Sequence, residues 1–304
     1  MTYAFRIAAD WGTSNLRVFA LDEGGGVLAE ASSDDGMGRL TPAQYEPALM
    51  ALIGGWLDPA RVTPVLVCGM AGARQGWIEA AYRAVPCAPV GGPFARPKVE
   101  SPLIEVFIVP GLSQAEPADV MRGEETQIAG VLAGRPGFSG VVCLPGTHSK
   151  WAVIREGRVE RFLTLMTGEL FALLSAQSVL RHGMADDGEG MDTDAFAAAV
   201  RETATEPAGF AASLFRLRAE NLLEGLAPRA ARSRLSGLLI GIEMASARAL
   251  WQDEPTLIVG TGPLGRLYAT ALTQLGASAE AVSGEAMALA GLTRAFANIE
   301  EDKS

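Results

Sequence analysis

Histidine and cysteine are scarce in this sequence, and their scarcity excludes two kinds of site. Only two histidines, His148 and His182, are present, which leaves little room for a histidine-based metal centre. The three cysteines, Cys68, Cys87 and Cys143, have no metal-ligand spacing and would leave one thiol over if two were paired. We therefore expect reduced thiols and a cytoplasmic location, because disulfides persist in oxidising compartments.

Positive charge and long apolar runs are lacking too. The 25 Lys and Arg residues are outnumbered by 35 Asp and Glu, for a net charge of −10, which argues against nucleic acid or an anionic membrane as the main partner. No apolar run reaches the roughly 18 residues of a membrane span. The start of the chain, residues 1–6, lacks the basic and apolar regions of a signal peptide. Small molecules remain as expected partners, and a homodimer is left open.

The apolar residues that are present follow an α/β pattern. At 304 residues and 49% hydrophobic content, the chain is long enough for two domains of about 150 residues each. Short apolar runs typical of buried strands alternate with stretches of helical spacing. The strand-like runs are 64–68, 103–109, 256–259 and 279–282, and the helical stretches are 41–57, 167–180, 195–203, 210–225 and 227–251. The acidic stretch 186–194 does not fit an EF-hand, so we expect a solvated loop there.

The first hairpin carries an unusual turn. Apolar residues 5–9 lead into Asp10-Trp11-Gly12-Thr13-Ser14-Asn15, and apolar residues 16–21 and 27–31 follow as two further strands. Close backbone N–H groups and small hydroxyls can bind phosphate, and a carboxylate can bind a divalent cation. Alternatively, the polar side chains satisfy only their own backbone, as in most turns.

A second hairpin of the same kind occurs about one domain length later. Residues 141–144 lead into Pro145-Gly146-Thr147-His148-Ser149-Lys150, and residues 151–154 and 159–165 follow as strands. This repetition favours a functional interpretation, in which the two turns grip a phosphate tail from both sides of a cleft. Helix-breaking residues between 134 and 140 predict a boundary between a domain over 1–134 and one over 135–304.

Three further clusters lie where ligands bind in α/β proteins. Gly69-Met70-Ala71-Gly72-Ala73-Arg74-Gln75-Gly76-Trp77 follows a predicted strand and forms either a ligand edge or a flexible loop with an exposed arginine. Arg122-Gly123-Glu124-Glu125 opens a helix, where the carboxylates are either favourable N-terminal charges or a general base at a cleft. Gly260-Thr261-Gly262 joins a strand to a helix and suits a nucleotide base or ribose better than a full dinucleotide.

These motifs, in this order, resemble the actin-like ATPase superfamily, whose fold is two ribonuclease-H-like domains flanking an ATP cleft. More narrowly, the chain resembles the 2-dehydro-3-deoxygalactonokinases, which are sugar-acid kinases of galactonate breakdown. The blocks that carry this resemblance are residues 10–17, 69–77, 122–127, 144–151, 167–171 and 236–241. Pro145 departs from the superfamily, in which many members have an aspartate before the second Gly-Thr turn.

The resemblance implies roles for individual residues. Asp10 would hold Mg²⁺ and take part in catalysis, and Glu124, with Glu125 as second choice, would be the general base for a primary hydroxyl. The phosphates of ATP would be bound by Gly12, Thr13, Ser14, Gly146, Thr147 and Lys150, and the adenosine by Gly260, Thr261 and Gly262. Lys150 could instead be a surface residue, and His148 is expected to shape the turn.

The expected substrate is an acid, so a bidentate arginine is expected at its carboxylate. Arg74 is the first candidate, followed by Arg17 and Arg122, with Gln75 and Trp77 beside the substrate. The implied reaction is ATP-dependent phosphorylation of the 6-hydroxyl of 2-dehydro-3-deoxy-D-galactonate. Two alternatives are a kinase of the same fold for another sugar or sugar acid, and a non-catalytic nucleotide-binding sensor.

Overall fold

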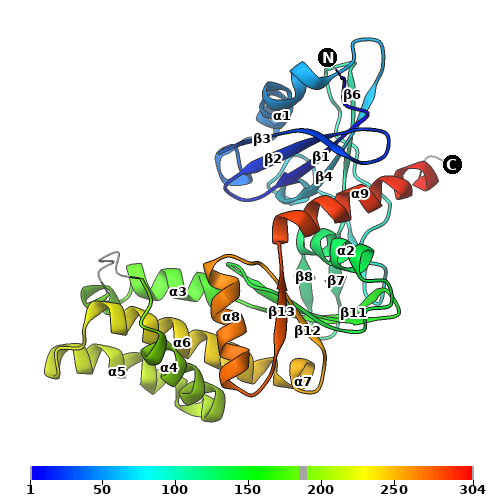
Figure 1. The fold of residues 1–304 in the computed structure, drawn as a ribbon. Coiled ribbons are helices and arrows are strands. Elements are labelled where there is room, and N and C mark those ends of the chain that lie inside the picture. Colours follow the sequence, from blue (N-terminus) through cyan, green and yellow to red (C-terminus); the bar gives the residue numbers. More distant parts are fainter. Residues whose placement is uncertain (1, 185–189, 303–304) are drawn as a thin grey trace. The chain divides into compact units, whose positions relative to one another are not determined.

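The computed structural model describes residues 2–184 and 190–302, and Figure 1 shows its ribbon. Of the acidic stretch, residues 186–189 lie outside the described part. Its last residues lead into helix α4 (Thr193–Thr205), whose N-cap is Asp192. The Asp192 carboxylate accepts a hydrogen bond of 3.0 Å from the backbone N–H of Ala195, and in this way satisfies a helix-end donor.

The remaining elements alternate between strands and helices along the chain. The strands are β1 (Arg6–Trp11), β2 (Leu16–Leu21), β3 (Val27–Ser33), β4 (Thr63–Gly69), β5 (Tyr82–Ala84), β6 (Ile104–Ile108), β7 (Gly111–Gln114), β8 (Asp119–Met121), β9 (Gly140–Leu144), β10 (Ser149–Arg155), β11 (Arg158–Leu165), β12 (Thr256–Val259) and β13 (Ala279–Val282). The α-helices are α1 (Tyr45–Ile53), α2 (Glu124–Gly134), α3 (Thr167–Ala176), α5 (Phe210–Leu223), α6 (Pro228–Ser246), α7 (Arg248–Trp251), α8 (Pro263–Gln274) and α9 (Gly284–Asp302). Short 3₁₀ turns are η1 (Met37–Arg39), η2 (Pro42–Gln44), η3 (Gly54–Trp56), η4 (Met70–Gly72), η5 (Val179–Gly183) and η6 (Pro207–Gly209).

Two five-stranded sheets have the same strand order. The first is β3-β2-β1-β4-β6 and the second is β11-β10-β9-β12-β13. In each, a three-strand meander is followed by strands added beside its first member, and β4 and β12 run parallel to β1 and β9. The duplication predicted from the two hairpins is therefore confirmed, and with it the α/β fold built from two ribonuclease-H-like sheets.

The chain divides into two compact units. Their limits differ from the single boundary expected at residue 134, because each unit is made of more than one segment of the chain. The first unit holds residues 1–138, 154–161 and 284–304, and the second holds 139–153 and 162–283. The C-terminal helix α9 thus belongs to the first unit, because Leu292, Ala295 and Phe296 are buried against strands of the first sheet. The tip of the β10–β11 hairpin joins the same unit, since Val159 and Cys87 exchange backbone hydrogen bonds of 2.9 and 3.2 Å.

Both faces of the first sheet are covered, and this sorts the side chains of each strand. Ile7 and Ala9 of β1 pack in the cluster that contains α1, whereas Ala8 packs in the cluster that contains α9. Side chains alternate along a strand, so Asp10 projects from the same face as Ala8. Strands buried on both faces read as near-continuous apolar runs, which is why β1 and β4 were recognisable in the sequence.

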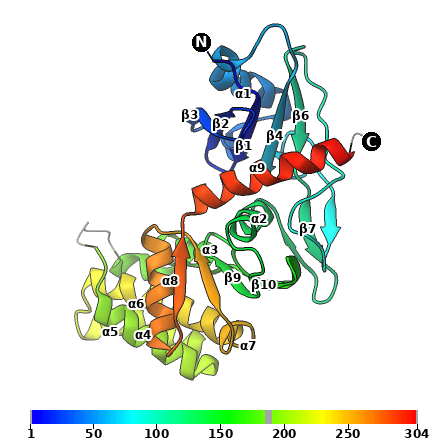
Figure 2. The ribbon, with the colours of Figure 1, turned by 45° about the vertical axis from the view of Figure 1, so that its right-hand side comes forward.

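The helices on the α9 side approach each other through glycines. Figures 1 and 2 both show α9 running beside α2. A Cβ atom added to Gly291 of α9 would lie 1.8 Å from the carbonyl oxygen of Thr126, and one added to Gly130 of α2 would lie 1.9 Å from that of Met287. Only glycine permits this backbone contact, which fixes the position of α2 and of the carboxylates at its start.

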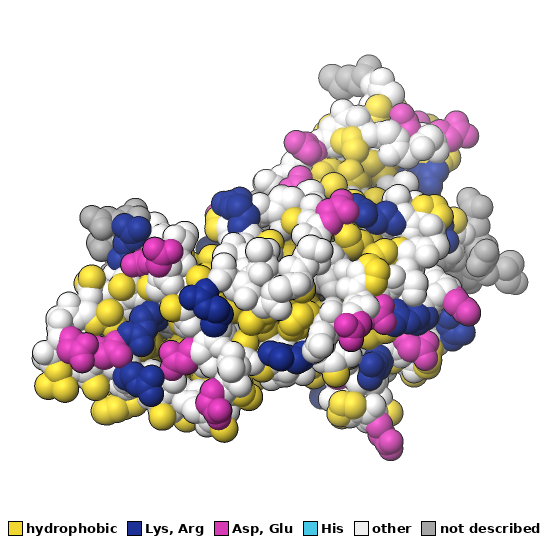
Figure 3. Space-filling model, turned by 60° about the horizontal axis from the view of Figure 1, so that its bottom comes forward, with side chains coloured by type: hydrophobic (Ala, Val, Ile, Leu, Met, Phe, Trp, Pro, Cys, Tyr) yellow, Lys and Arg dark blue, Asp and Glu magenta, His cyan; other side chains and the backbone are white. Residues whose placement is uncertain are grey.

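The small sheet β5-β7-β8 was not expected from the sequence. Each of its strands has only three or four residues, too few to show a reliable period of two. No helix within the described residues is long and apolar enough to cross a membrane. On the face drawn in Figure 3, basic and acidic side chains are interspersed rather than gathered into a patch of one sign.

We predict that Gly291→Ala destabilises the first unit by about 1–3 kcal/mol, because overpacking forces α2 and α9 apart. The matched control is Gly134→Ala at the end of α2, where an added Cβ meets nothing within 4 Å. Urea unfolding should show a lower midpoint for Gly291→Ala and an equal or higher one for the control. Equal midpoints for the two variants would contradict the proposed close contact.

Candidate active site

The turn after β1 is held by backbone hydrogen bonds from the segment that follows β3. Gly12 donates its N–H to Asn15 O at 2.9 Å, while Met37 and Gly38 donate theirs to Gly12 O at 3.0 Å and Thr13 O at 2.9 Å. Thr13 and Ser14 are exposed. The backbone carbonyls are thus used internally, and the two hydroxyls face solvent as a phosphate-binding turn requires.

Asp10 lies beside polar residues of the two strands that neighbour β1. It is opposite Arg17 on β2 and Cys68 on β4, and the Cys68 thiol donates to Asp10 Oδ1 at 3.7 Å. Burial raises the pKa of the Asp10 carboxyl, and the Arg17 guanidinium opposes that rise. A cation placed here would favour the ionised carboxylate.

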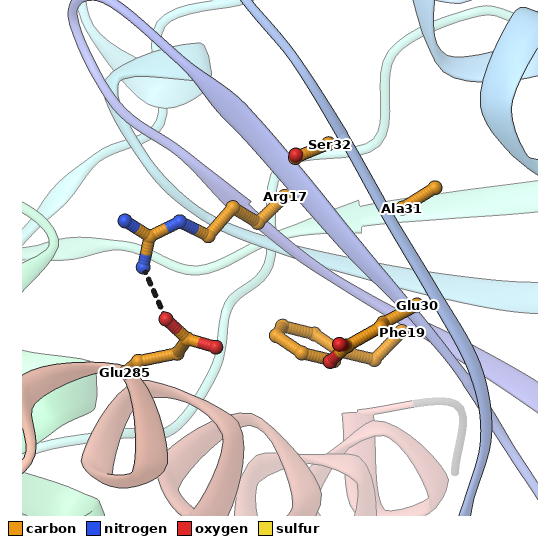
Figure 4. Close-up of a pocket in the computed structure, with 6 residues that line it drawn as sticks. All are labelled: Arg17, Phe19, Glu30, Ala31, Ser32 and Glu285. Carbon is orange, nitrogen blue, oxygen red and sulfur yellow. Dashed lines mark hydrogen bonds and ion pairs between the residues drawn. The ribbon is translucent and has the colours of Figure 1, made fainter.

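Arg17 is shared between carboxylates. It forms an ion pair of 3.0 Å with Glu285 at the start of α9 in addition to its position beside Asp10 (Figure 4). The pair borders a surface cavity of about 300 Å³, which is further lined by Phe19, Glu30, Ala31 and Ser32. With acidic partners on both sides, Arg17 is a weaker candidate for a substrate carboxylate than its sequence position suggested.

The two carboxylates at the start of α2 have different environments. Glu124 is half-buried, and its Oε2 accepts the Arg122 N–H at 3.0 Å. Glu125 is fully buried and accepts hydrogen bonds from Gly123 N at 2.7 Å and Thr126 Oγ1 at 3.0 Å. Burial, reinforced by the Glu124 charge, raises the pKa of Glu125 to about 8.

A buried polar chain connects these groups. Thr126 is hydrogen-bonded to the Cys68 thiol as well as to Glu125, and Cys68 in turn contacts Asp10. Burial raises the pKa of the Cys68 thiol well above its usual range, so it remains a neutral donor. Neither Cys68 nor Thr126 was a candidate from the sequence, because only the strand register places Cys68 next to Asp10.

The loop after β4 presents some of its predicted residues and buries others. Arg74 and Gln75 are exposed, and Arg74 forms an ion pair of 3.3 Å with Glu79. Trp77 is half-buried and stacks on Tyr45, with ring centroids 5.8 Å apart. Trp77 therefore anchors the loop to the core of the first unit, while Arg74 extends from it.

Arg122 lies beneath the same loop. Its Nη2 donates to Ala80 O at 2.8 Å, and its guanidinium lies 4.4 Å from the centroid of the Tyr82 ring. Nε and Nη1 are buried and make no hydrogen bond. Gly72 leaves room for this guanidinium, since a Cβ there would lie 2.8 Å from Nη1.

In the second unit, the turn after β9 is docked on the start of α3. Glu169 donates its N–H to Thr147 O at 3.0 Å, and a Cβ added to Gly168 would lie 2.4 Å from Gly146 O. His148 contacts the Glu169 carboxylate at 2.5 Å, in keeping with its expected role of shaping the turn. Lys150 is only 4% exposed and donates to His148 O at 3.2 Å, so it is not a surface lysine.

A largely apolar cavity of about 430 Å³ adjoins this turn within the second unit. Gly146, Thr147 and Gly168 line one side, and residues of α6 and α8, including Ile240, Leu264 and Tyr268, line the other. Gly260-Thr261-Gly262 leads into α8, and Gly260 has a φ of +137° that favours glycine. The volume falls in the range of small-ligand pockets.

Comparison with known proteins gives concordant matches over almost the whole chain. A sequence model of the 2-keto-3-deoxy-galactonokinase family matches residues 10–295. A protein named as a probable 2-dehydro-3-deoxygalactonokinase from Rhizobium meliloti (strain 1021) is 42% identical over 97% of each chain, and the 2-dehydro-3-deoxygalactonokinase of Escherichia coli (strain K12) is 35% identical over 94% of this chain and 95% of its own. A crystal structure from Sinorhizobium meliloti, assigned as a 2-dehydro-3-deoxygalactonokinase, superposes with a TM-score of 0.90 at 40% identity over 97% of this chain and 99% of its own.

The raised pKa of Glu125 predicts a pH-dependent stability that Glu125→Gln removes. Between the unfolded pKa near 4.5 and the folded pKa near 8, the folded state keeps a proton that the unfolded state loses, so wild-type stability falls as pH rises. Glutamine resembles the protonated acid but does not titrate, so it adds no pH dependence to the free energy of unfolding. The unfolding free energy of the variant relative to wild type should therefore increase between pH 5 and pH 8, by up to about 1.4 kcal/mol per pH unit. A constant difference across this range would contradict the assignment.

Proposed function

Because this chain belongs to the 2-keto-3-deoxy-galactonokinase family, we propose that it uses ATP to phosphorylate the 6-hydroxyl of 2-dehydro-3-deoxy-D-galactonate. The product is 2-dehydro-3-deoxy-6-phosphogalactonate, an intermediate of galactonate breakdown. The observation that carries this proposal is the family match over residues 10–295, which includes both phosphate turns and the glycine turn before α8.

We assign Asp10 to Mg²⁺. No group of three or more metal-ligating side chains occurs within residues 2–184 and 190–302, so a cage made only of protein ligands is absent from them. Mg²⁺ typically uses one or two carboxylates together with water and substrate phosphates, and the half-buried carboxylate of Asp10 fits that requirement. When bound, the ion would neutralise charge on the transferring phosphoryl group.

Within the first unit, Glu124 is the better candidate for the general base. A base must reach the hydroxyl that it deprotonates, and Glu125 is fully buried, with both of its oxygens hydrogen-bonded inside the protein. Glu125 instead holds the start of α2 through Gly123 and Thr126. Thr13 and Ser14 supply N–H and hydroxyl donors for phosphate oxygens, while Gly12, whose N–H donates to Asn15 O, shapes the turn that presents them.

Within the second unit, Gly146 and Thr147 supply further phosphate donors, and Lys150 supplies a positive charge beneath their turn. The adjoining cavity accepts the adenosine, with Gly260, Thr261 and Gly262 placing the start of α8 beside it. Phosphoryl transfer depends mainly on positioning and charge neutralisation, which is what these groups provide.

An acceptor panel tests the proposed reaction. ATP-dependent product formation should be fastest with 2-dehydro-3-deoxygalactonate among 2-oxo-3-deoxy sugar acids, neutral hexoses and acetylated amino sugars. Preferred turnover of a neutral hexose would refute the acceptor assignment, and turnover of no acceptor would favour a non-catalytic sensor.

Asp10→Asn should lower kcat by at least about 100-fold while circular dichroism stays unchanged, because the charge that holds the metal is lost.

We predict that Arg74→Ala raises KM for the sugar acid by about 10-fold, the loss expected for a charge-assisted contact, with little change in KM for ATP. Arg96→Ala is the matched control, because Arg96 is a partly exposed arginine of the same unit that is paired with Glu105. An unchanged acceptor KM in Arg74→Ala would transfer the carboxylate contact to Arg122 or Arg17.

A further inference from the structure

Glu243 of α6 is a buried carboxylate that accepts hydrogen bonds from four side chains. Ser149 Oγ and Tyr268 OH donate to Oε2 at 2.7 Å, Thr167 Oγ1 donates to the same oxygen, and Trp151 Nε1 donates to Oε1 at 2.8 Å. No pattern in the sequence indicated this cluster. Glu243 interrupts the apolar residues of α6, which the pattern indicated only as core.

The four donors come from the elements that carry the proposed nucleotide groups. Ser149 and Trp151 lie on β10, immediately after the phosphate turn. Thr167 begins α3, next to the glycine that packs against Gly146, and Tyr268 lies on α8. Thr167 and Tyr268 also line the cavity assigned to adenosine. One carboxylate therefore connects α6 to two elements that line the cavity, α3 and α8, and to β10, which follows the turn at its edge.

A carboxylate suits this arrangement because it can accept hydrogen bonds at both of its oxygens. Trp151 Nε1 can only donate, and three hydroxyls converge on the other oxygen. An amide in the same place would either direct its N–H groups at the indole N–H, or direct them at the three hydroxyls, which would then have to accept from it instead of donating to it. Burying a carboxylate is costly, and burial raises the pKa of Glu243, but the four hydrogen bonds oppose that rise.

We propose that Glu243 is a positioning residue for the nucleotide, holding the second phosphate turn, the start of α3 and α8 in the arrangement that binds ATP. The inference rests on the proposed kinase function for its ligand. Glu243 does not touch ATP in this proposal, and acts through Ser149, Thr167 and Tyr268.

The main test compares Glu243→Gln with Glu220→Gln. Glu220 is a matched control, because its carboxylate is 19% exposed and joins α5 to α6 through Arg234 without lining the cavity. Titration calorimetry with a non-hydrolysable ATP analogue should show at least about 10-fold weaker binding for Glu243→Gln, equivalent to about 1.4 kcal/mol. KM for ATP should rise in parallel while KM for the sugar acid stays within about 2-fold, and Glu220→Gln should match wild type.

A second variant keeps the test decisive if Glu243→Gln fails to fold. Tyr268→Phe removes one donor and keeps the ring that lines the cavity, and it should weaken analogue binding by about 3-fold. A folded Glu243→Gln or Tyr268→Phe variant with wild-type affinity for the analogue would overturn the proposal. Equal increases in KM for ATP and KM for the sugar acid would overturn it too. Wild-type protein that binds the analogue but phosphorylates no acceptor would refute the proposed function alone, because the binding comparison would still test Glu243.

Discussion

Burial of both sheet faces is the constraint on which the rest of this structure depends. In the first unit, helices cover the two faces of the sheet, so the middles of β1 and β4 must be apolar. Polar side chains are then confined to the strand ends, where Asp10 and Cys68 lie next to each other. Ligand sites of α/β proteins form at such edges for the same reason, since they are the only polar parts of a covered sheet.

The carboxylates near these edges fall into two classes according to their hydrogen bonds. Glu125 and Glu243 are buried, and protein donors occupy their oxygens: those of Glu125 come from the start of its own helix, and those of Glu243 come from β10, α3 and α8. Glu124 and Asp10 are half-buried. A carboxylate surrounded by protein donors organises structure, whereas one that solvent reaches can bind a cation or accept a proton.

Close backbone contacts at glycine provide the precision that such a site needs. Gly291 and Gly130 set the distance between α9 and α2, and Gly168 brings α3 against the turn after β9. A methyl group at any of these positions would overlap a carbonyl oxygen. Contacts of this kind position the polar groups without adding polar atoms, because backbone packs directly on backbone.

The sequence by itself determined the duplicated hairpins, most buried strands and the residue types of the Gly-Thr turn in each hairpin, because these depend on local periodicity and turn chemistry. Tertiary structure alone decided which residues meet. Helix α9 belongs to the first unit because its apolar face packs against the first sheet. Trp77 is half-buried because its ring stacks on Tyr45. The Glu243 cluster brings together residues up to 94 positions apart. Such pairings depend on strand register and helix packing across distant segments, and no local pattern encodes them.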